Sequence, residues 1–251
     1  MTLDVRGSLN NTKLSKNPYV VFEELLSNPN DSFLIRRDDD TAVSNLEVTF
    51  AVEFWSSDLL GDEINFKVTC SDNGCGLGDE QANAFLTKDT SYKDDLAISG
   101  IGKCKGSGRI QYFHHFADVS LDSTYRMGEQ VFKRSLKFSD PQVQIEFEQF
   151  EIADGVEAEI GTTVALSNLK PNVRERIFSA ENLQQVFSAG SLKNAMLVGF
   201  LQSLVSLNER LGDFRIVFKT SFKKEGVDQN EETLLEKADL PEVSNTREAN
   251  V

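Results

Sequence analysis

Apolar and polar residues alternate in several stretches of the chain, which is the pattern of a β-strand with one buried face. The clearest case is residues 46–55, in which every second residue from Leu46 to Phe54 is apolar. Residues 63–70 repeat the pattern just before a glycine-rich turn. By the same reasoning we expect further strands at residues 119–125, 130–138, 143–152, 162–169 and 214–220.

Other stretches place apolar residues at helical spacing. They predict helices at residues 18–28, 80–86, 110–116 and 179–211, the last with a break near Gly190. A polar, glycine-rich loop runs from residue 87 to residue 108 between two of these helices. A loop of this length is too long for an ordinary connection, and long ordered loops are often functional lids.

The two ends of the chain differ from its middle. Residues 1–16 are polar and are expected to form a loop-like N-terminal arm. Residues 224–251 are acidic and show little apolar periodicity, so we expect this tail to be disordered or to begin a further region. The folded domain is therefore predicted to span residues 17–223.

The order of the predicted elements indicates a fold class. Strands and helices are mixed, with several antiparallel hairpins and few strand–helix–strand alternations. This favours an α/β (α+β) two-layer sandwich, in which helices cover one face of a mixed, mostly antiparallel sheet.

Composition is that of a globular protein, and the charge excludes some partners. Hydrophobic residues make up 39% of the chain and include 18 Phe, which is enough apolar material for a core. The net charge of -14 makes the chain a poor binder of phosphate backbones, so direct binding of nucleic acid is not expected. A nucleotide remains compatible with this charge, because Mg²⁺ and backbone N–H groups can neutralise its phosphates locally.

Cysteine usage and hydropathy indicate a cytoplasmic protein that does not enter a membrane. Cys70, Cys75 and Cys104 are odd in number and match no paired metal-binding spacing, so we interpret them as reduced thiols. No apolar run approaches the roughly 18 residues that a membrane span needs. The first residues lack the apolar segment of a signal peptide.

The first candidate site residues are Glu24 and Asn28, which lie four positions apart in a predicted helix and so share one face. A carboxylate in this position can polarise a water molecule, and an amide oxygen one turn later can coordinate Mg²⁺. A helical Glu and Asn are also ordinary surface residues.

The second candidate is the turn that follows the strand at residues 63–70. Its glycines, Gly74 and Gly76, allow a tight turn and the approach of a flat ring, and Leu77 completes the turn. Asp72, at the mouth of the strand, can accept a hydrogen bond from an exocyclic amine. The alternative is a plain β-turn, since Asn-Gly is a strong turn signal.

The third candidate is the end of the long loop, which leads into the helix at residues 110–116. Bare backbone N–H groups and a helix N-terminus form an anion site, and Lys103 adds positive charge in an acidic chain. The pattern is neither a Walker A motif nor a Rossmann turn. A flexible linker is the alternative. The residues concerned are Gly102, Lys103, Gly106, Ser107 and Gly108.

Taken in order, these motifs and the Gly-Thr pair that ends in Thr162 resemble the GHKL superfamily of ATPases. This superfamily includes gyrase-type topoisomerases, heat-shock chaperones, mismatch-repair ATPases, the MORC group and sensor histidine kinases. The resemblance covers about residues 17–169 and implies a Bergerat fold that binds ATP and Mg²⁺. The segment that ends in Lys93 is similar to one in the chaperone-like and MORC-like branches.

The resemblance implies roles for the candidate residues. Glu24 would activate the attacking water, and Asn28 would be the Mg²⁺ ligand. Asp72 would read the adenine amino group, with Gly76 against the base and Thr162 near the same end. Gly102, Gly106 and Gly108 would form the lid around the phosphates, and Lys93 would meet a phosphate.

Pro29 departs from the family pattern, which usually has a small helix former directly after the Asn. A proline inside a helix typically costs about 3 kcal/mol and disfavours helical geometry in the preceding residue. We therefore expect the helix to end or kink at Asn28. This would shift Asn28 and weaken Mg²⁺ binding. It also weakens the match of Asp31, three residues after Asn28, to the corresponding residue of the family.

The sequence thus predicts an ATP-binding domain that hydrolyses ATP with Mg²⁺. ATP would close the lid and ADP would release it. Closure would drive formation of a homodimer, or it would act on a protein partner or a downstream transducer domain. A non-hydrolysing nucleotide switch and a structural domain without nucleotide remain alternatives. A histidine-kinase-like domain is a further alternative, although Glu24 argues against it and His114 and His115 are poor phospho-acceptor candidates.

Overall fold

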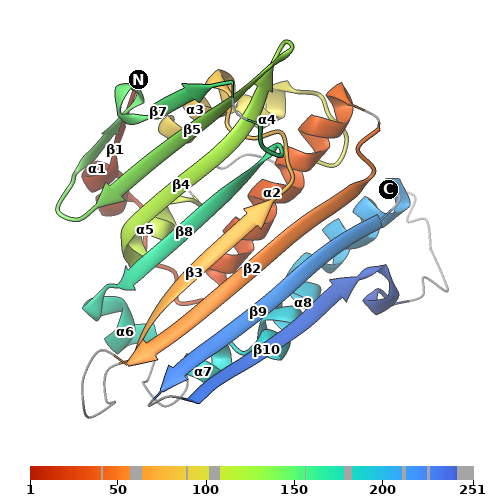
Figure 1. Ribbon diagram of the computed structural model, residues 1–251. Coiled ribbons are helices and arrows are strands. Elements are labelled where there is room, and N and C mark those ends of the chain that lie inside the picture. Colours follow the sequence, from red (N-terminus) through yellow and green to blue (C-terminus); the bar gives the residue numbers. More distant parts are fainter. Residues whose placement is uncertain are drawn as a thin grey trace, which may run out of the picture.

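An open sheet of eight strands forms the framework of the protein in this computed structural model (Figure 1). The structure describes residues 1–40, 42–56, 64–88, 90–101, 108–155, 157–177, 183–210, 213–224 and 227–241. The strands lie in the order β10 (Val227–Glu236), β9 (Asp213–Lys224), β2 (Asn45–Ser56), β3 (Ile64–Asp72), β8 (Gly161–Leu169), β4 (Phe116–Met127), β5 (Gln130–Ser139) and β7 (Glu151–Asp154). Of these described neighbours, β2 and β9 run parallel and the other pairs are antiparallel.

Helices lie behind this sheet in the view of Figure 1. The two longest are α2 (Val20–Asp39), which contacts β2, and α8 (Ala189–Arg210), which contacts β9 and β10. The shorter helices are α3 (Asp79–Leu86), α4 (Tyr92–Asp95), α5 (Ile110–His115), α6 (Pro171–Ile177) and α7 (Leu183–Val186). The predicted class, helices against a mixed and mostly antiparallel sheet, is confirmed. Within the described part of the chain, none of the helices is both long and apolar enough to cross a membrane.

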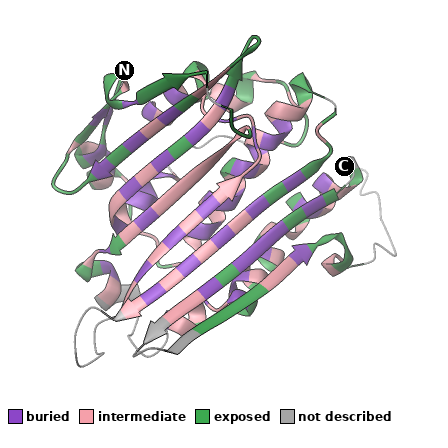
Figure 2. Cartoon of the chain, in the orientation of Figure 1, coloured by how far each residue is buried: buried purple, intermediate pink, exposed green. Residues whose placement is uncertain are grey.

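Phenylalanine side chains fill much of the space between the helices and the sheet. Phe22 of α2 packs 5.1 Å from the Phe187 ring and 5.9 Å from Phe50 of β2, between ring centroids. Phe50 in turn stacks on Phe218 of β9 at 5.2 Å. Buried residues alternate with more accessible ones along the strands in Figure 2, as one-sided burial requires. Aromatic burial therefore fixes α2 against the centre of the sheet.

Helix α2 continues through Pro29, so the expectation that it ends at Asn28 is wrong. A proline at this position cannot supply the N–H that would bond the carbonyl oxygen of Leu25. Cys70 of β3 replaces it, because its Sγ donates to Leu25 O at 3.3 Å. Burial raises the pKa of Cys70 well above that of a free thiol, so the group keeps its proton and remains a donor.

The N-terminal arm is also structured, contrary to the sequence-based expectation. Residues Thr2–Asp4 form β1, which pairs with β6 (Gln144–Glu146) in a separate two-stranded sheet. Helix α1 (Val5–Asn11) follows, and Asp4 caps it by accepting from the N–H of Gly7 at 2.8 Å. An Asp at the start of a helix is a recognisable cap, and the polar character of the segment obscured it.

Two further segments differ from their expected structure. The single strand expected at residues 143–152 is divided into β6, the 3₁₀ turn η1 (Phe147–Gln149) and β7. Residues 227–241 are ordered as β10 and the turn η2 (Lys237–Asp239), and Leu235 is 0% exposed opposite Ile216. Pairing with β9 and burial of this leucine outweigh the acidic composition of the segment.

Because Cys70 replaces the donor that Pro29 lacks, the effects of substituting Cys70 and Pro29 on the free energy of unfolding should not be additive. Replacing Cys70 by Ala should lower the free energy of unfolding by about 1–3 kcal/mol, because the Leu25 carbonyl loses its donor in a buried site. In a Pro29→Ala background the N–H of residue 29 can bond this carbonyl, so the cost of Cys70→Ala should be smaller. Urea denaturation of the four proteins of this double-mutant cycle measures the difference. An equal cost in both backgrounds would contradict the replacement.

Candidate functional site

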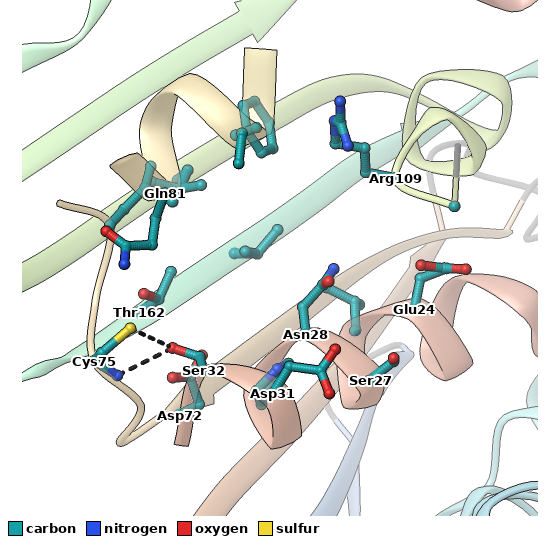
Figure 3. Close-up of a pocket in the computed structure, with 18 of the residues that line it drawn as sticks. Glu24, Ser27, Asn28, Asp31, Ser32, Asp72, Cys75, Gln81, Arg109 and Thr162 are labelled. Carbon is teal, nitrogen blue, oxygen red and sulfur yellow. Dashed lines mark hydrogen bonds between the residues drawn. The ribbon is translucent and has the colours of Figure 1, made fainter. Parts of the chain in front are cut away.

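A cavity of about 280 Å³ lies between α2, the strands β3 and β8, helix α3 and the segment around α4 (Figure 3). Helix α2 forms one wall, and α3 together with the residues just before α5 forms the opposite wall. Its volume is near the lower end of the range for small-molecule sites. The polar residues that line it include most of the candidates that the sequence indicated.

One face of α2 supplies the polar groups of the first wall. Asn28 lies four residues after Glu24, and Asp31 and Ser32 lie three and four residues after Asn28, which are the spacings that keep side chains on one face of a helix. Figure 3 shows the side chains of the first three on the cavity side of the helix. This face is continuous only because α2 passes through Pro29. Asn28 and Asp31 therefore both line the cavity.

Glu24 lies in the part of the cavity next to Gly108. A Cβ added at Gly108 would overlap the Glu24 carboxylate, so a larger residue at this position would push that side chain aside. Burial raises the pKa of Glu24, while the positive charges of Lys93 and Arg109 oppose the rise and the carboxylates of Glu23 and Asp31 add to it. The carboxylate thus lies in a desolvated pocket that still holds counter-charges.

Asn28 and Asp31 share a partner, Lys93 of α4. The Lys93 ammonium donates to Asp31 Oδ2 at 2.6 Å and to Asn28 Oδ1 at 3.2 Å. The amide nitrogen of Asn28 donates to the hydroxyl of Tyr112 at 3.3 Å. Burial raises the pKa of Tyr112 well above its usual value, so this hydroxyl stays neutral.

Asp72 lies at the other end of the cavity, beside Thr162, because these residues are paired in the register of β3 with β8. The Asp72 carboxylate accepts the N–H of Gly74 at 2.8 Å and a backbone hydrogen bond from Thr162. Desolvation raises the pKa of Asp72 to about 7, although these two N–H groups and the charge of Arg36 oppose the rise.

The turn after Asp72 is fixed from both sides. Arg36 of α2 donates to the carbonyl of Asn73 at 2.7 Å, and the Cys75 N–H donates to Ser32 Oγ at 3.0 Å. Gly76 has a φ of 77°, and a Cβ there would overlap the carbonyl of Thr124 in β4. A glycine is therefore required at this position by the fold itself. The Leu77 N–H donates to Ser123 at 2.8 Å, which aligns the end of the turn.

Apolar side chains separate the two polar ends. Leu121 and Val164 lie on the sheet side of the cavity, and Leu25, Leu77 and Phe85 line its other sides. The guanidinium of Arg109 lies 5.5 Å from the centre of the Phe85 ring, and its Nη2 donates to the carbonyl of Thr87 at 2.7 Å. The cavity is thus polar at its ends and apolar between them.

The structure brings most of the predicted site residues together. The cavity is lined by Glu24, Asn28, Asp72, Gly76, Leu77, Lys93, Gly108 and Thr162. Gly74 is instead buried behind the turn, where a Cβ would clash with Ser32. The remaining predicted residues, Gly102, Lys103, Gly106 and Ser107, lie outside the described residues.

Several lining residues were missing from the predicted set, namely Asp31, Ser32, Cys75, Gln81, Arg109 and Tyr112. Helical spacing from Asn28 could have identified Asp31 and Ser32 if Pro29 had not been expected to end the helix. Arg109 and Tyr112 enter the cavity through the packing of α5, for which the sequence gives no local signal. Cys70 and Cys75 are free thiols, and Cys104 lies outside the described residues.

Neither a scan against models of protein families nor a search of curated proteins finds a match for this chain. The chemistry of the site therefore has to be inferred from its geometry.

The raised pKa of Asp72 predicts how stability depends on pH. Between the ordinary carboxyl pKa and about 7 the folded protein holds a proton that the unfolded chain has released. The contribution of this group to stability therefore falls as the pH rises through that window. Asp72→Asn removes the titration, so its free energy of unfolding should increase relative to wild type between about pH 5 and about pH 8. Urea denaturation at both pH values tests this, and a constant difference between the proteins would contradict it.

Proposed function

We propose that the cavity binds ATP as in the GHKL ATPases, within a Bergerat fold, and that the protein hydrolyses ATP with Mg²⁺. The observation that supports this proposal best is the distribution of polarity in the cavity. A desolvated carboxyl, Asp72, lies at one end, apolar walls follow, and Glu24 lies with Gly108 and Arg109 at the other end. An adenine nucleotide has the same order of parts, with an amine, a flat ring and then phosphates.

The base end matches an amino-purine because its acceptor is fixed. Two backbone N–H groups hold the Asp72 carboxylate, and Arg36 fixes the turn beside it. An exocyclic amine can donate to the remaining acceptor capacity of such a carboxylate. A site built to accept a hydrogen bond strongly rejects a ligand that lacks the donor, because its polar group is then left without a partner. Asp72 would therefore select the base.

The phosphate end offers oxygen ligands for a cation and positive charges for the phosphates. Asn28 and Asp31 carry the hard oxygen atoms that Mg²⁺ prefers. Bound Mg²⁺ would neutralise charge on the phosphate oxygens. Lys93 and Arg109 would supply further positive charge in a chain whose net charge is -14. The residues present therefore fit the group.

Glu24 is the proposed general base for hydrolysis. In hydrolysis the water oxygen bonds to the γ-phosphorus as the bond to the ADP oxygen breaks, and Glu24 takes the proton from the water. Burial raises the pKa of Glu24 toward the range that suits a general base, while Lys93 and Arg109 favour its ionised form. A non-hydrolysing switch would need no desolvated carboxylate next to Gly108.

The two histidines do not support transfer of phosphate to a histidine of this chain. His114 Nε2 lies 2.6 Å from the carbonyl of Thr12, and His115 is buried with Nδ1 2.8 Å from the carbonyl of Gln111. Burial lowers the pKa of both, to about 4 for His115. Both face the protein's own backbone.

Movement of the segment around α4 on nucleotide binding would transmit the state of the site to the protein surface. Thr90, Tyr92 and Lys93 line the cavity, so ligand contacts would act directly on this segment. We propose that ATP closes the segment and that ADP releases it, which changes the surface offered to a second copy of the chain or to a protein partner.

Replacing Glu24 by Ala tests the proposed chemistry. ATP binding should persist, because Asp72 and the phosphate contacts remain. Turnover should fall by roughly 10²–10⁴-fold, the usual contribution of a general base. Phosphate release under steady-state conditions measures the rate, and calorimetry checks that ATP still binds.

Glu23→Ala is the matched control, because Glu23 is the neighbouring carboxylate of α2 and accepts from Asn17 Nδ2 at 2.8 Å outside the cavity. Its turnover should stay close to that of wild type. Equal turnover in Glu24→Ala and Glu23→Ala would exclude Glu24 as the base. Binding without turnover in the wild-type protein would favour the non-hydrolysing switch.

A further inference from the structure

The ammonium group of Lys93 occupies the position between the two oxygen atoms that would receive a metal ion. Its Nζ lies 2.6 Å from Asp31 Oδ2 and 3.2 Å from Asn28 Oδ1. The helix α2 presents both oxygens, and Lys93 reaches them from α4, which is distant along the chain. A compact cation that contacts two hard oxygen atoms is the arrangement that Mg²⁺ also adopts.

The burial of Asp31 explains why this position holds a positive charge. The Asp31 side chain is only 3% exposed, whereas that of Lys93 is 21% exposed. An ionised carboxylate at this depth is stabilised by a neighbouring cation, and removing that cation is costly. Lys93 can leave toward solvent, but Asp31 is fixed within α2.

The amide of Asn28 is oriented toward the same position. Its nitrogen donates to the hydroxyl of Tyr112 at 3.3 Å, so its oxygen is directed toward Lys93. Tyr112 is itself buried in α5. The oxygen of Asn28 is therefore available to a cation whether or not Lys93 is the one present.

We propose that Lys93 competes with a divalent cation: in the absence of nucleotide its ammonium fills the position between Asn28 Oδ1 and Asp31 Oδ2 that the cation would otherwise take. Lys93 gives up this position when Mg²⁺ arrives with the phosphates, and it then contacts the phosphates instead. The exchange rests on the proposed ATP function, whereas the cation site itself does not. Asp31 keeps a positive neighbour in both states, and the movement of Lys93 transmits the exchange to α4.

Only two side chains, Asn28 and Asp31, would coordinate the cation, which agrees with reversible binding. Among the described residues, no three His, Cys, Asp or Glu side chains gather into a metal site. One carboxylate and one amide leave most positions around Mg²⁺ to water and phosphate, as is usual for nucleotide-bound Mg²⁺. The site would therefore bind the ion weakly unless Lys93 is absent or phosphates are present.

The proposal is tested by replacing Lys93 with a neutral residue and measuring metal binding in the absence of nucleotide. Mn²⁺ is titrated into the full chain, and the free ion is measured by its electron paramagnetic resonance signal. Lys93→Met should bind one Mn²⁺ at least about tenfold more tightly than wild type, because the metal takes over the neutralisation of Asp31. The double variant Lys93→Met/Asp31→Asn should lose this gain.

Two variants serve as controls. Lys133→Met removes a lysine from an exposed pair with Asp122, whose side chains are 48% and 49% exposed, and it should bind Mn²⁺ like wild type. Lys93→Arg retains a cation at the site and should also bind like wild type. If Lys93→Met is unfolded without metal, Mg²⁺ should restore its far-ultraviolet circular dichroism.

Equal Mn²⁺ affinity of Lys93→Met and wild type would overturn the proposal. The same conclusion would follow if Lys93→Met/Asp31→Asn kept the gain, or if Mg²⁺ failed to restore an unfolded Lys93→Met protein. These readouts use no nucleotide, so they are independent of ATP binding. Failure of the wild type to bind ATP would overturn the proposed function and leave the cation site to be decided by the Mn²⁺ titration.

Discussion

The docking of α2 on the sheet is the constraint on which the candidate site depends. Phe22 packs against Phe50 and Phe187, and the thiol of Cys70 bonds the carbonyl of Leu25 that Pro29 leaves without its helical donor. Both contacts fix the helix on the sheet, and this position brings its polar side chains to the cavity beside them. If the helix ended at Asn28, Asp31 and Ser32 would not follow Glu24 along a single wall.

Desolvated acids and the basic side chains near them determine the electrostatics of this cavity. Desolvation raises the pKa of both Glu24 and Asp72, at opposite ends. Lys93, Arg36 and Arg109 offset part of that cost from α4, from α2 and from the start of α5. A chain of net charge -14 thus gathers positive charge around its cavity. In the proposed function Lys93 exchanges its carboxylate partner Asp31 for a phosphate, which links ligand binding to the segment around α4.

The sequence predicted the strands with alternating apolar residues well, because one-sided burial imposes that period directly. It also indicated Glu24, Asn28, Asp72 and Thr162, which the register of β3 with β8 and the spacing along α2 bring to one cavity. It failed where tertiary contacts outweigh local preference. The donor that replaces the N–H of residue 29 comes from β3, and β10 is ordered by its pairing with β9. No local pattern could reveal either contact.

Calorimetric titration of ATP with Mg²⁺ into the wild-type protein and into Asp72→Asn tests the central claim most directly. We expect the wild type to bind one ATP and Asp72→Asn to lose most of this affinity, because the amide presents an N–H group to the adenine amine in place of an acceptor. Urea denaturation establishes that the variant is folded. No binding by the wild type, or equal affinities of the two folded proteins, would contradict an adenine site at Asp72.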